Sequence, residues 1–290
     1  VGFTGSYKGG KALMDIASQR KEPIPVYAEM GSNNPMFILP GLMNSDKEKI
    51  ASNIAASVNL GAGQFCTNPG ILVVRKTDGY EDFVAALKNA FMELQPSVML
   101  NHSIYKAYEK GKISCANRNE VEMVFQRTSE LDDLKGNPAI ALISAQDFIT
   151  DESYQNEVFG PFTLLVSCEN DTEFLKVAEC LHGQLTCTIY GNEDEIVEED
   201  QLAEILTTKC GRLIYNGVPT GVEVSHAMHH GGPFPSSSNG MYTSVGTAAI
   251  DRFARTVCFQ NAPVKLLPDA IKPGNPLNIW RTVNGVKSRS

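Results

Sequence analysis

The chain has 290 residues, 42% hydrophobic and 20% charged, which is typical of a folded globular protein and excludes a disordered or fibrous one. Its formal net charge is -8 and it contains no dense run of Lys and Arg, so we expect no nucleic-acid surface. Because it lacks an apolar run of about 18 residues, a signal-peptide pattern and any CxxC pair among its seven cysteines, we expect a cytoplasmic protein with reduced thiols and no membrane partner.

The N-terminal segment predicts a strand, a turn and a helix in that order. VGFTGS is typical of the end of a strand, and the turn GSYKGG leads into the helical stretch KALMDIASQR, whose apolar residues lie on one face. The segment PIPVYAEMGSNNPMFILP predicts two short strands, because Gly31 and the turn at residues 33–35 interrupt it. The capping-box pair Ser45 and Glu48 predicts a helix that continues through Val58 and stops near Gly61.

From residue 71 onward strand and helix patterns alternate, which predicts an α/β fold. The strands are ILVVRK, AIALIS, FTLLVSC, LTCTIYG and GRLIYNG, and the helices lie near EDFVAALKNAFMEL, DTEFLKVAECL and EDEIVEEDQLAEILTT. Between the first of these helices and about Pro138 we expect only turns. A Pro-rich tail from Pro263 to Pro276 leads to LNIWRTVNG, which we expect to form a strand offered to another subunit.

Three residues in loops or at strand ends have side chains suited to a catalytic or binding site. Cys66 lies in the Gly-rich segment GAGQFCTNPG, which can hold a reactive thiol in a polar loop, although a buried structural cysteine is the alternative. Glu29 lies at a strand end, where burial is expected to raise its pKa toward that of a general base; otherwise it is a solvated loop residue. Glu157 in NEVFGPF can bind two ribose hydroxyls or be an exposed turn residue, and Phe159 can line the cofactor or the core.

Two further patterns are similar to known motifs, but they argue against a nucleotide hydrolase and against a metal site. GSYKGGKA is close to a phosphate loop but has Ala12 where a magnesium-binding Ser or Thr is required, so what remains is a Gly-rich helix start that suits a phosphate. His226, His229 and His230 lie close together, but no Cys pair accompanies them, so we expect no metal there.

Five segments, FTGS, AEMGSNNP, GQFCTNPG, EVFGPF and HHGGPFPSSSNG, occur in the order found in the aldehyde dehydrogenase superfamily, which the whole chain resembles. The resemblance implies that Cys66 is the nucleophile and Glu29 the general base. It also implies that Gly5 and Ser6 contact the phosphates of NAD or NADP. Glu157 would bind a ribose, with Phe159 beside it. Ser32 and Asn33 depart from the second Gly and the Lys of many relatives, which favours a subgroup.

The resemblance also implies the domain organisation and the partners. Residues 1–30 would end a dinucleotide-binding domain, 31–255 would form a three-layer α/β/α catalytic domain, and 256–290 would form a C-terminal tail used in homo-oligomerisation. The chain begins with Val1, and most of the cofactor domain would lie upstream, so we expect this chain alone to bind the cofactor weakly and to be inactive.

The subgroup resemblance implies a small aldehyde that carries a carboxylate, α-ketoglutarate semialdehyde, with Phe65 and Thr67 as pocket walls. The product would be the acid, formed through a thiohemiacetal and a thioester on Cys66. The alternatives are a fatty aldehyde as substrate, or a cysteine hydrolase or acyltransferase, which needs a histidine within reach of Cys66.

Overall fold

The computed structural model describes residues 1–127 and 134–289. Two compact units make up this part of the chain, Val1–Arg252 and Phe253–Ser290. The expected division at residues 30 and 255 stays a prediction. The part of the expected turn region at 128–133 lies outside the described residues.

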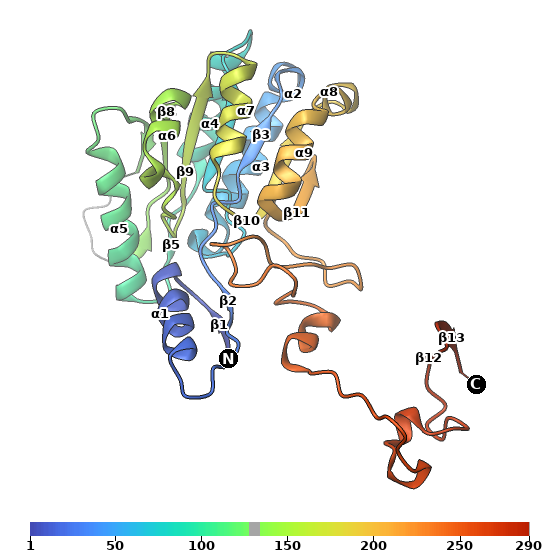
Figure 1. The fold of residues 1–290 in the computed structure, drawn as a ribbon. Coiled ribbons are helices and arrows are strands. Elements are labelled where there is room, and N and C mark those ends of the chain that lie inside the picture. Colours follow the sequence, from blue (N-terminus) through green and yellow to red (C-terminus); the bar gives the residue numbers. More distant parts are fainter. Residues whose placement is uncertain (128–133, 290) are drawn as a thin grey trace. The chain divides into compact units, whose positions relative to one another are not determined.

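A seven-stranded sheet forms the centre of the first unit (Figure 1). Its strands, in spatial order, are β11 (Cys210–Tyr215), β10 (Gln184–Tyr190), β3 (Met36–Ile38), β4 (Ile71–Arg75), β9 (Phe162–Cys168), β8 (Ala139–Ser144) and β6 (Glu122–Gln126). All neighbouring pairs are parallel except β6 with β8, which is antiparallel. Two small sheets lie beside it, β1 (Gly2–Thr4) with β2 (Tyr27–Glu29) and β5 (Ser97–Val98) with β7 (Lys135–Gly136).

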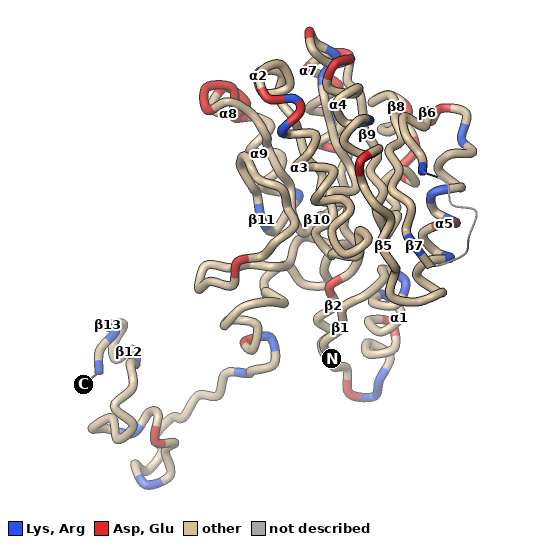
Figure 2. The backbone as a smooth tube through the Cα atoms, turned by 180° about the vertical axis from the view of Figure 1, so that it is seen from behind, with Lys and Arg blue, Asp and Glu red and all other residues tan. Residues whose placement is uncertain are grey.

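Both faces of the large sheet are buried, as its sequence pattern requires. Strands β3, β8, β9 and β10 carry no charged residue, and Figure 2 shows many of the charged residues on the helices and turns around the sheet. In β3, Phe37 points to one face while Met36 and Ile38 point to the other. A continuous apolar strand is expected where helices cover both faces of a parallel sheet. The fold is therefore the expected three-layer α/β/α arrangement.

Two groups of helices provide the outer layers. On one face pack α5 (His102–Ala116), α6 (Ala145–Thr150), α7 (Asp171–Cys180) and α9 (Asp200–Lys209), and on the other pack α2 (Pro40–Ser45), α3 (Lys47–Asn59) and α4 (Tyr80–Glu93). The remaining helices are α1 (Tyr7–Ser18) and α8 (Glu193–Glu198). Among the described residues, no helix has the length and the apolar run needed to cross a lipid bilayer.

Two predictions about the helices are wrong. The capping box at Ser45 does not form, because Ser45 ends the short helix α2 and Asp46 precedes α3. The expected turns before Pro138 include the helix α5 and the strand β6, since α5 places Lys112 among its buried residues and so lacks a clear apolar stripe.

The second unit contains short 3-10 turns and a hairpin of β12 (Arg281–Val283) and β13 (Val286–Ser288). The expected strand in LNIWRTVNG therefore exists in part, and its partner is the next segment of the same chain. Several large apolar side chains are exposed in this unit, among them Leu266, Trp280 and Val286.

The loop before β4 depends on Gly63. Gly63 has φ +67, and a Cβ there would lie 2.1 Å from the backbone carbonyl carbon of Gly160. Both the left-handed backbone and the close approach therefore require glycine. This contact holds the loop that carries Cys66 against the start of β9.

We expect Gly63→Ala to lower the free energy of unfolding by about 2 kcal/mol more than Gly221→Ala does. Gly221 is the matched control, because it also has positive φ (+89) but no atom within 4 Å of a built Cβ. Urea unfolding of both variants measures the difference. Equal losses would show that the contact with Gly160 is unimportant.

Candidate active site

The loops that precede the parallel strands gather at the amino ends of β3, β4, β9, β10 and β11. Asn34 precedes β3, Cys66 precedes β4, and Glu157 precedes β9. Within this group Asn34 is central: its Nδ2 donates to the carbonyls of Cys66 (3.0 Å) and Asn68 (2.9 Å), and its Oδ1 accepts from Thr186 (3.1 Å). These bonds fix the nucleophile loop to the sheet.

Ser32 and Asn33, the two departures from the family pattern, are buried members of a polar network. Gln184 Oε1 accepts hydrogen bonds from Ser32 Oγ (3.0 Å), from the backbone amide of Asn33 (2.8 Å) and from that of Asn34 (3.2 Å). Asn33 Nδ2 donates to the carbonyl of Gln155 at 2.5 Å. The two side chains therefore connect the turn after Glu29 to β10 and to the segment that carries Glu157.

Strand β2 and the loop around residues 229–244 place Glu29. Thr4 pairs with Glu29 in the parallel β1–β2 register, and the amide of Gly5 donates to the Glu29 carbonyl at 3.1 Å. On the other side Glu29 forms an antiparallel bridge with Ser237. The backbone of Glu29 is thus held between the segment that leads into α1 and a loop from the far end of the unit.

Cys66, Glu29 and His230 form one cluster. The Cys66 Sγ lies 3.2 Å from His230 Nε2, which lies 3.3 Å from Glu29 Oε1, and the three ligand atoms are all within 4.8 Å of one another. His230 and Glu29 are buried, and Cys66 is half-buried. Ser244 Oγ donates to Glu29 Oε2, and Thr243 Oγ1 accepts from the amide of His230 at 2.8 Å.

In this cluster the imidazole of His230 is positively charged and lies between the Cys66 thiol and the Glu29 carboxylate. Burial lowers the pKa of His230, but hydrogen bonds and charge from Cys66 and Glu29 outweigh burial and raise it to about 9. Burial raises the pKa of Glu29, but hydrogen bonds from His230 and Ser244 outweigh it and leave the pKa below its usual value. The expectation of a raised pKa at Glu29 is therefore wrong, because it considered burial without partners.

Both contacts of His230 use the same ring nitrogen. Nε2 faces the thiol and the carboxylate, while the buried Nδ1 has no hydrogen-bond partner in the described part of the chain. In a Ser-His-Asp triad the two ring nitrogens instead serve the nucleophile and the acid separately. Proton relay through the ring is therefore not available here.

Two of the four predicted cofactor residues line a cavity of about 600 Å³. Ser6 and Glu157 line it together, with Gly31, His182 and Phe234 among the others. Ser6 caps α1 by accepting from the amide of Gly9 at 3.3 Å, so the helix start faces this cavity. Gly5 and the half-buried Phe159 are outside its lining, and so is Cys66.

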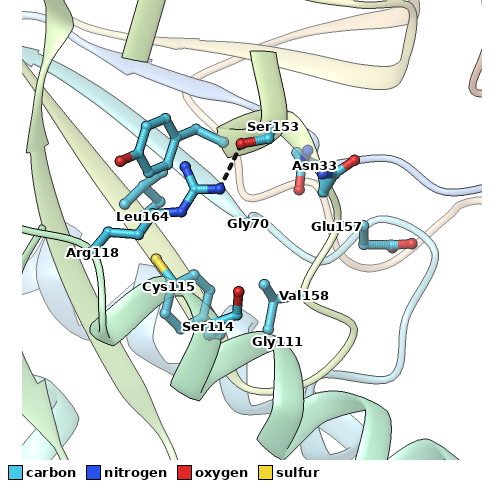
Figure 3. Close-up of a pocket in the computed structure, with 13 residues that line it drawn as sticks. Asn33, Gly70, Gly111, Ser114, Cys115, Arg118, Ser153, Glu157, Val158 and Leu164 are labelled. Atoms are coloured by element: carbon cyan, nitrogen blue, oxygen red, sulfur yellow. Dashed lines mark hydrogen bonds between the residues drawn. The ribbon is translucent and has the colours of Figure 1, made fainter. Parts of the chain in front are cut away.

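Glu157 also borders a second cavity of about 140 Å³ (Figure 3). In this view its carboxylate points away from Arg118, which donates to Ser153 at 2.6 Å. Burial raises the pKa of Glu157 to about 7, against a hydrogen bond from the backbone of Ser32 that lowers it. In the described part of the chain, no cationic side chain offsets the effect of burial on this carboxylate.

The two predicted pocket walls differ in exposure. Phe65 is 40% exposed, whereas Thr67 is 1% exposed and packs inside the loop. The role of His230 as a neighbour of Cys66 was not predicted, although the group of three histidines was noted and a cysteine hydrolase was expected to need a histidine within reach of Cys66. Arg212 on β11 was also missed; it is half-buried, and burial lowers the pKa of its guanidinium.

The raised pKa of His230 predicts a pH-dependent stability. The folded pKa of about 9 exceeds the ordinary 6.5, so the contribution is present below pH 6.5 and is lost as pH rises through about 9. This contribution to the free energy of unfolding is at most about 3 kcal/mol. Urea unfolding across this pH range should show the loss of stability in the unmodified protein and in the control His226→Asn, which changes an exposed histidine. His230→Asn should not show this loss. The same pH dependence in all three proteins would contradict a positively charged His230.

Comparisons with known proteins identify the family of the chain. Residues 1–257 match the model of the aldehyde dehydrogenase family. Two curated relatives are alpha-ketoglutaric semialdehyde dehydrogenases. The one from Acinetobacter baylyi is 41% identical over 293 residues, covering 100% of this chain and 55% of the relative. The one from Azospirillum brasilense is 41% identical over 285 residues, covering 98% and 54%. The chain spans about half the length of these relatives.

Solved structures share the fold. A 1-pyrroline-5-carboxylate dehydrogenase from Thermus with bound NAD aligns with a TM-score of 0.71 at 20% identity, over 87% of this chain and 48% of that one. A gamma-glutamyl-gamma-aminobutyraldehyde dehydrogenase from Burkholderia cenocepacia aligns with a TM-score of 0.70 at 18% identity, over 87% and 50%. With its family match over residues 1–257 and this architecture, the chain belongs to the aldehyde dehydrogenase family.

Proposed function

We propose that the protein containing this chain oxidises an aldehyde to its acid with NAD or NADP, using Cys66 as nucleophile and Glu29 as base. The observation that carries the proposal is the cluster of Cys66, Glu29 and His230 in a chain of this family. The relatives at 41% identity support the same activity.

His230 prepares Cys66 for attack. An imidazolium 3.2 Å from the sulfur stabilises the thiolate, which is the nucleophilic form. The thiolate adds to the aldehyde carbonyl and gives a thiohemiacetal, and loss of hydride leaves a thioester on Cys66. A thiolate is also a good leaving group, so the same residue serves the second step.

Glu29 acts on the thioester. Its lowered pKa keeps it ionised at neutral pH, so it can accept a proton from the water that attacks the thioester. Hydrolysis releases the acid and returns the Cys66 thiolate, and the proton on Glu29 passes to solvent. The low pKa reduces the basicity of Glu29, so position beside Cys66 must contribute much of its effect.

The residues around the large cavity fit a dinucleotide. The start of α1 at Ser6 offers backbone amides and a positive dipole end to a phosphate, and Glu157 offers two oxygens to ribose hydroxyls. NAD or NADP supplies the hydride acceptor when bound. Solved relatives whose descriptions include bound NAD support this use.

The hydrolase alternative now has a histidine near Cys66, but the arrangement does not favour it. Nε2 of His230 contacts both the thiol and the acid, and family membership points to oxidation. Incubating the full-length protein with aldehyde and NAD or NADP separates the two. Oxidation produces reduced cofactor together with acid, whereas a hydrolase or acyltransferase reduces no cofactor.

For the substrate we propose α-ketoglutarate semialdehyde, as the two curated relatives support. Arg212 offers a positive charge for its carboxylate. The guanidinium donates from Nη2 to the Pro219 carbonyl at 3.0 Å, its Nε has no partner, and no carboxylate pairs with it among the described residues. Gly211 beside it packs on the backbone of Gly231, next to His230. A fatty aldehyde carries no charge for Arg212 to bind.

Three further expectations remain proposals. We propose that residues 256–290 serve in homo-oligomerisation, for which the exposed Leu266, Trp280 and Val286 give support. A cytoplasmic location and inactivity of the 290-residue chain by itself likewise stay predictions.

Glu29→Gln should lower steady-state turnover about 100-fold or more, because it removes the base of the hydrolytic step. Cys66 and His230 remain, so a pre-steady-state burst of reduced cofactor should persist. Stopped-flow measurement of the first turnover tests this. Loss of the burst along with turnover would place Glu29 before hydride transfer.

Arg212→Met should raise KM for α-ketoglutarate semialdehyde about 10- to 100-fold, the value of a charged hydrogen bond. KM for an uncharged aldehyde of similar length should change little, and Arg212→Lys should recover part of the loss. Steady-state kinetics with both aldehydes measure this. An equal rise in KM for both would assign Arg212 to structure alone.

A further inference from the structure

The three polar atoms of the cluster converge on one point. Cys66 Sγ and Glu29 Oε1 both face the same nitrogen, His230 Nε2, at 3.2 and 3.3 Å. A single N–H can point squarely at only one of two acceptors. A cation at the common point can instead accept a lone pair from each of the three atoms.

The spacing is that of a tetrahedral zinc site. Zinc lies about 2.3 Å from thiolate sulfur, about 2.0 Å from imidazole nitrogen and about 2.1 Å from carboxylate oxygen, which puts neighbouring ligand atoms roughly 3.3 to 3.6 Å apart. The two measured separations, 3.2 and 3.3 Å, are within a few tenths of an ångström of these values. The third pair of atoms, the Cys66 sulfur and the Glu29 carboxylate oxygen, is within 4.8 Å, so small side-chain rotations would bring all three atoms to coordination distance from one ion.

The surroundings favour such an ion. Ser244 Oγ donates to Glu29 Oε2, which leaves Oε1 directed at His230 and fixes the orientation of the carboxylate. Cys66 is half-buried, so an ion can reach the sulfur and a water molecule can complete its coordination. Thiolate and imidazole prefer Zn²⁺ or Co²⁺ over Mg²⁺ or Ca²⁺.

We propose that Glu29, Cys66 and His230 form a three-ligand site for zinc-class divalent cations, whose occupation blocks the reaction. The ion binds the sulfur lone pair that attacks the aldehyde and the carboxylate oxygen that accepts the proton of water. Its binding releases to solvent the proton on His230, and also that of Cys66 where the thiol is protonated. Metal binding needs no aldehyde or cofactor, so its test is independent of the proposed function.

The test uses Co²⁺ as a spectroscopic substitute, added to the full-length protein without cofactor. We expect a sulfur-to-cobalt charge-transfer band with the intensity of a tetrahedral complex, lost when excess Zn²⁺ is added but not when Mg²⁺ is added. Cys66→Ser should lose the band. His230→Asn should weaken Co²⁺ binding about 100-fold, roughly one ligand's share of a zinc site.

Two matched controls should leave the band unchanged: His226→Asn at an exposed histidine of the same loop, and Cys258→Ser at an exposed cysteine. Far-ultraviolet circular dichroism checks that each variant is folded. The absence of a band in the folded unmodified protein, or equal Co²⁺ affinity in His230→Asn, would overturn the proposal. Inhibition of aldehyde oxidation by Zn²⁺ but not by Mg²⁺ provides a second, activity-based readout of the same site.

Discussion

The site depends on the position of one imidazole nitrogen. His230 Nε2 lies 3.2 Å from the Cys66 sulfur and 3.3 Å from a Glu29 oxygen. Burial alone would lower the pKa of His230, but these two contacts raise it to about 9. The positive charge of His230 lowers the pKa of Glu29. The pKa values of His230 and Glu29 are therefore linked, since each group favours the charged form of the other.

The fold brings these groups together from distant parts of the chain. Cys66 and His230 are 164 residues apart in sequence, and Glu29 and Ser244 are 215 apart. Asn34 ties the Cys66 loop to the start of β3, and the bridge between Glu29 and Ser237 ties β2 to the loop after Pro233. Strands and the polar bonds at their ends thus fix a site that consists of two loop residues, Cys66 and His230, and of Glu29 at the end of β2.

Local patterns predicted the order of most strands and helices, the strand-end position of Glu29 and the loop position of Cys66, because periodicity and glycine-rich turns are local properties. They missed α5, since the buried Lys112, paired with Glu109 at 2.7 Å, interrupts its apolar stripe. They also missed the partner of Cys66. His230 was visible as one of three loop histidines, but only tertiary contacts decide which of them meets the thiol. The pKa of Glu29 was wrong for the same reason, since its hydrogen-bond partners come from a distant loop.

The central claim, that His230 activates Cys66, is tested most directly by alkylation rates. Limited iodoacetamide followed by peptide mapping of the full-length protein should label Cys66 before the exposed Cys258 and the buried Cys168 and Cys187. In folded His230→Asn the Cys66 rate should fall to that of Cys258. Labelling of another cysteine first, or an unchanged Cys66 rate in His230→Asn, would contradict the account.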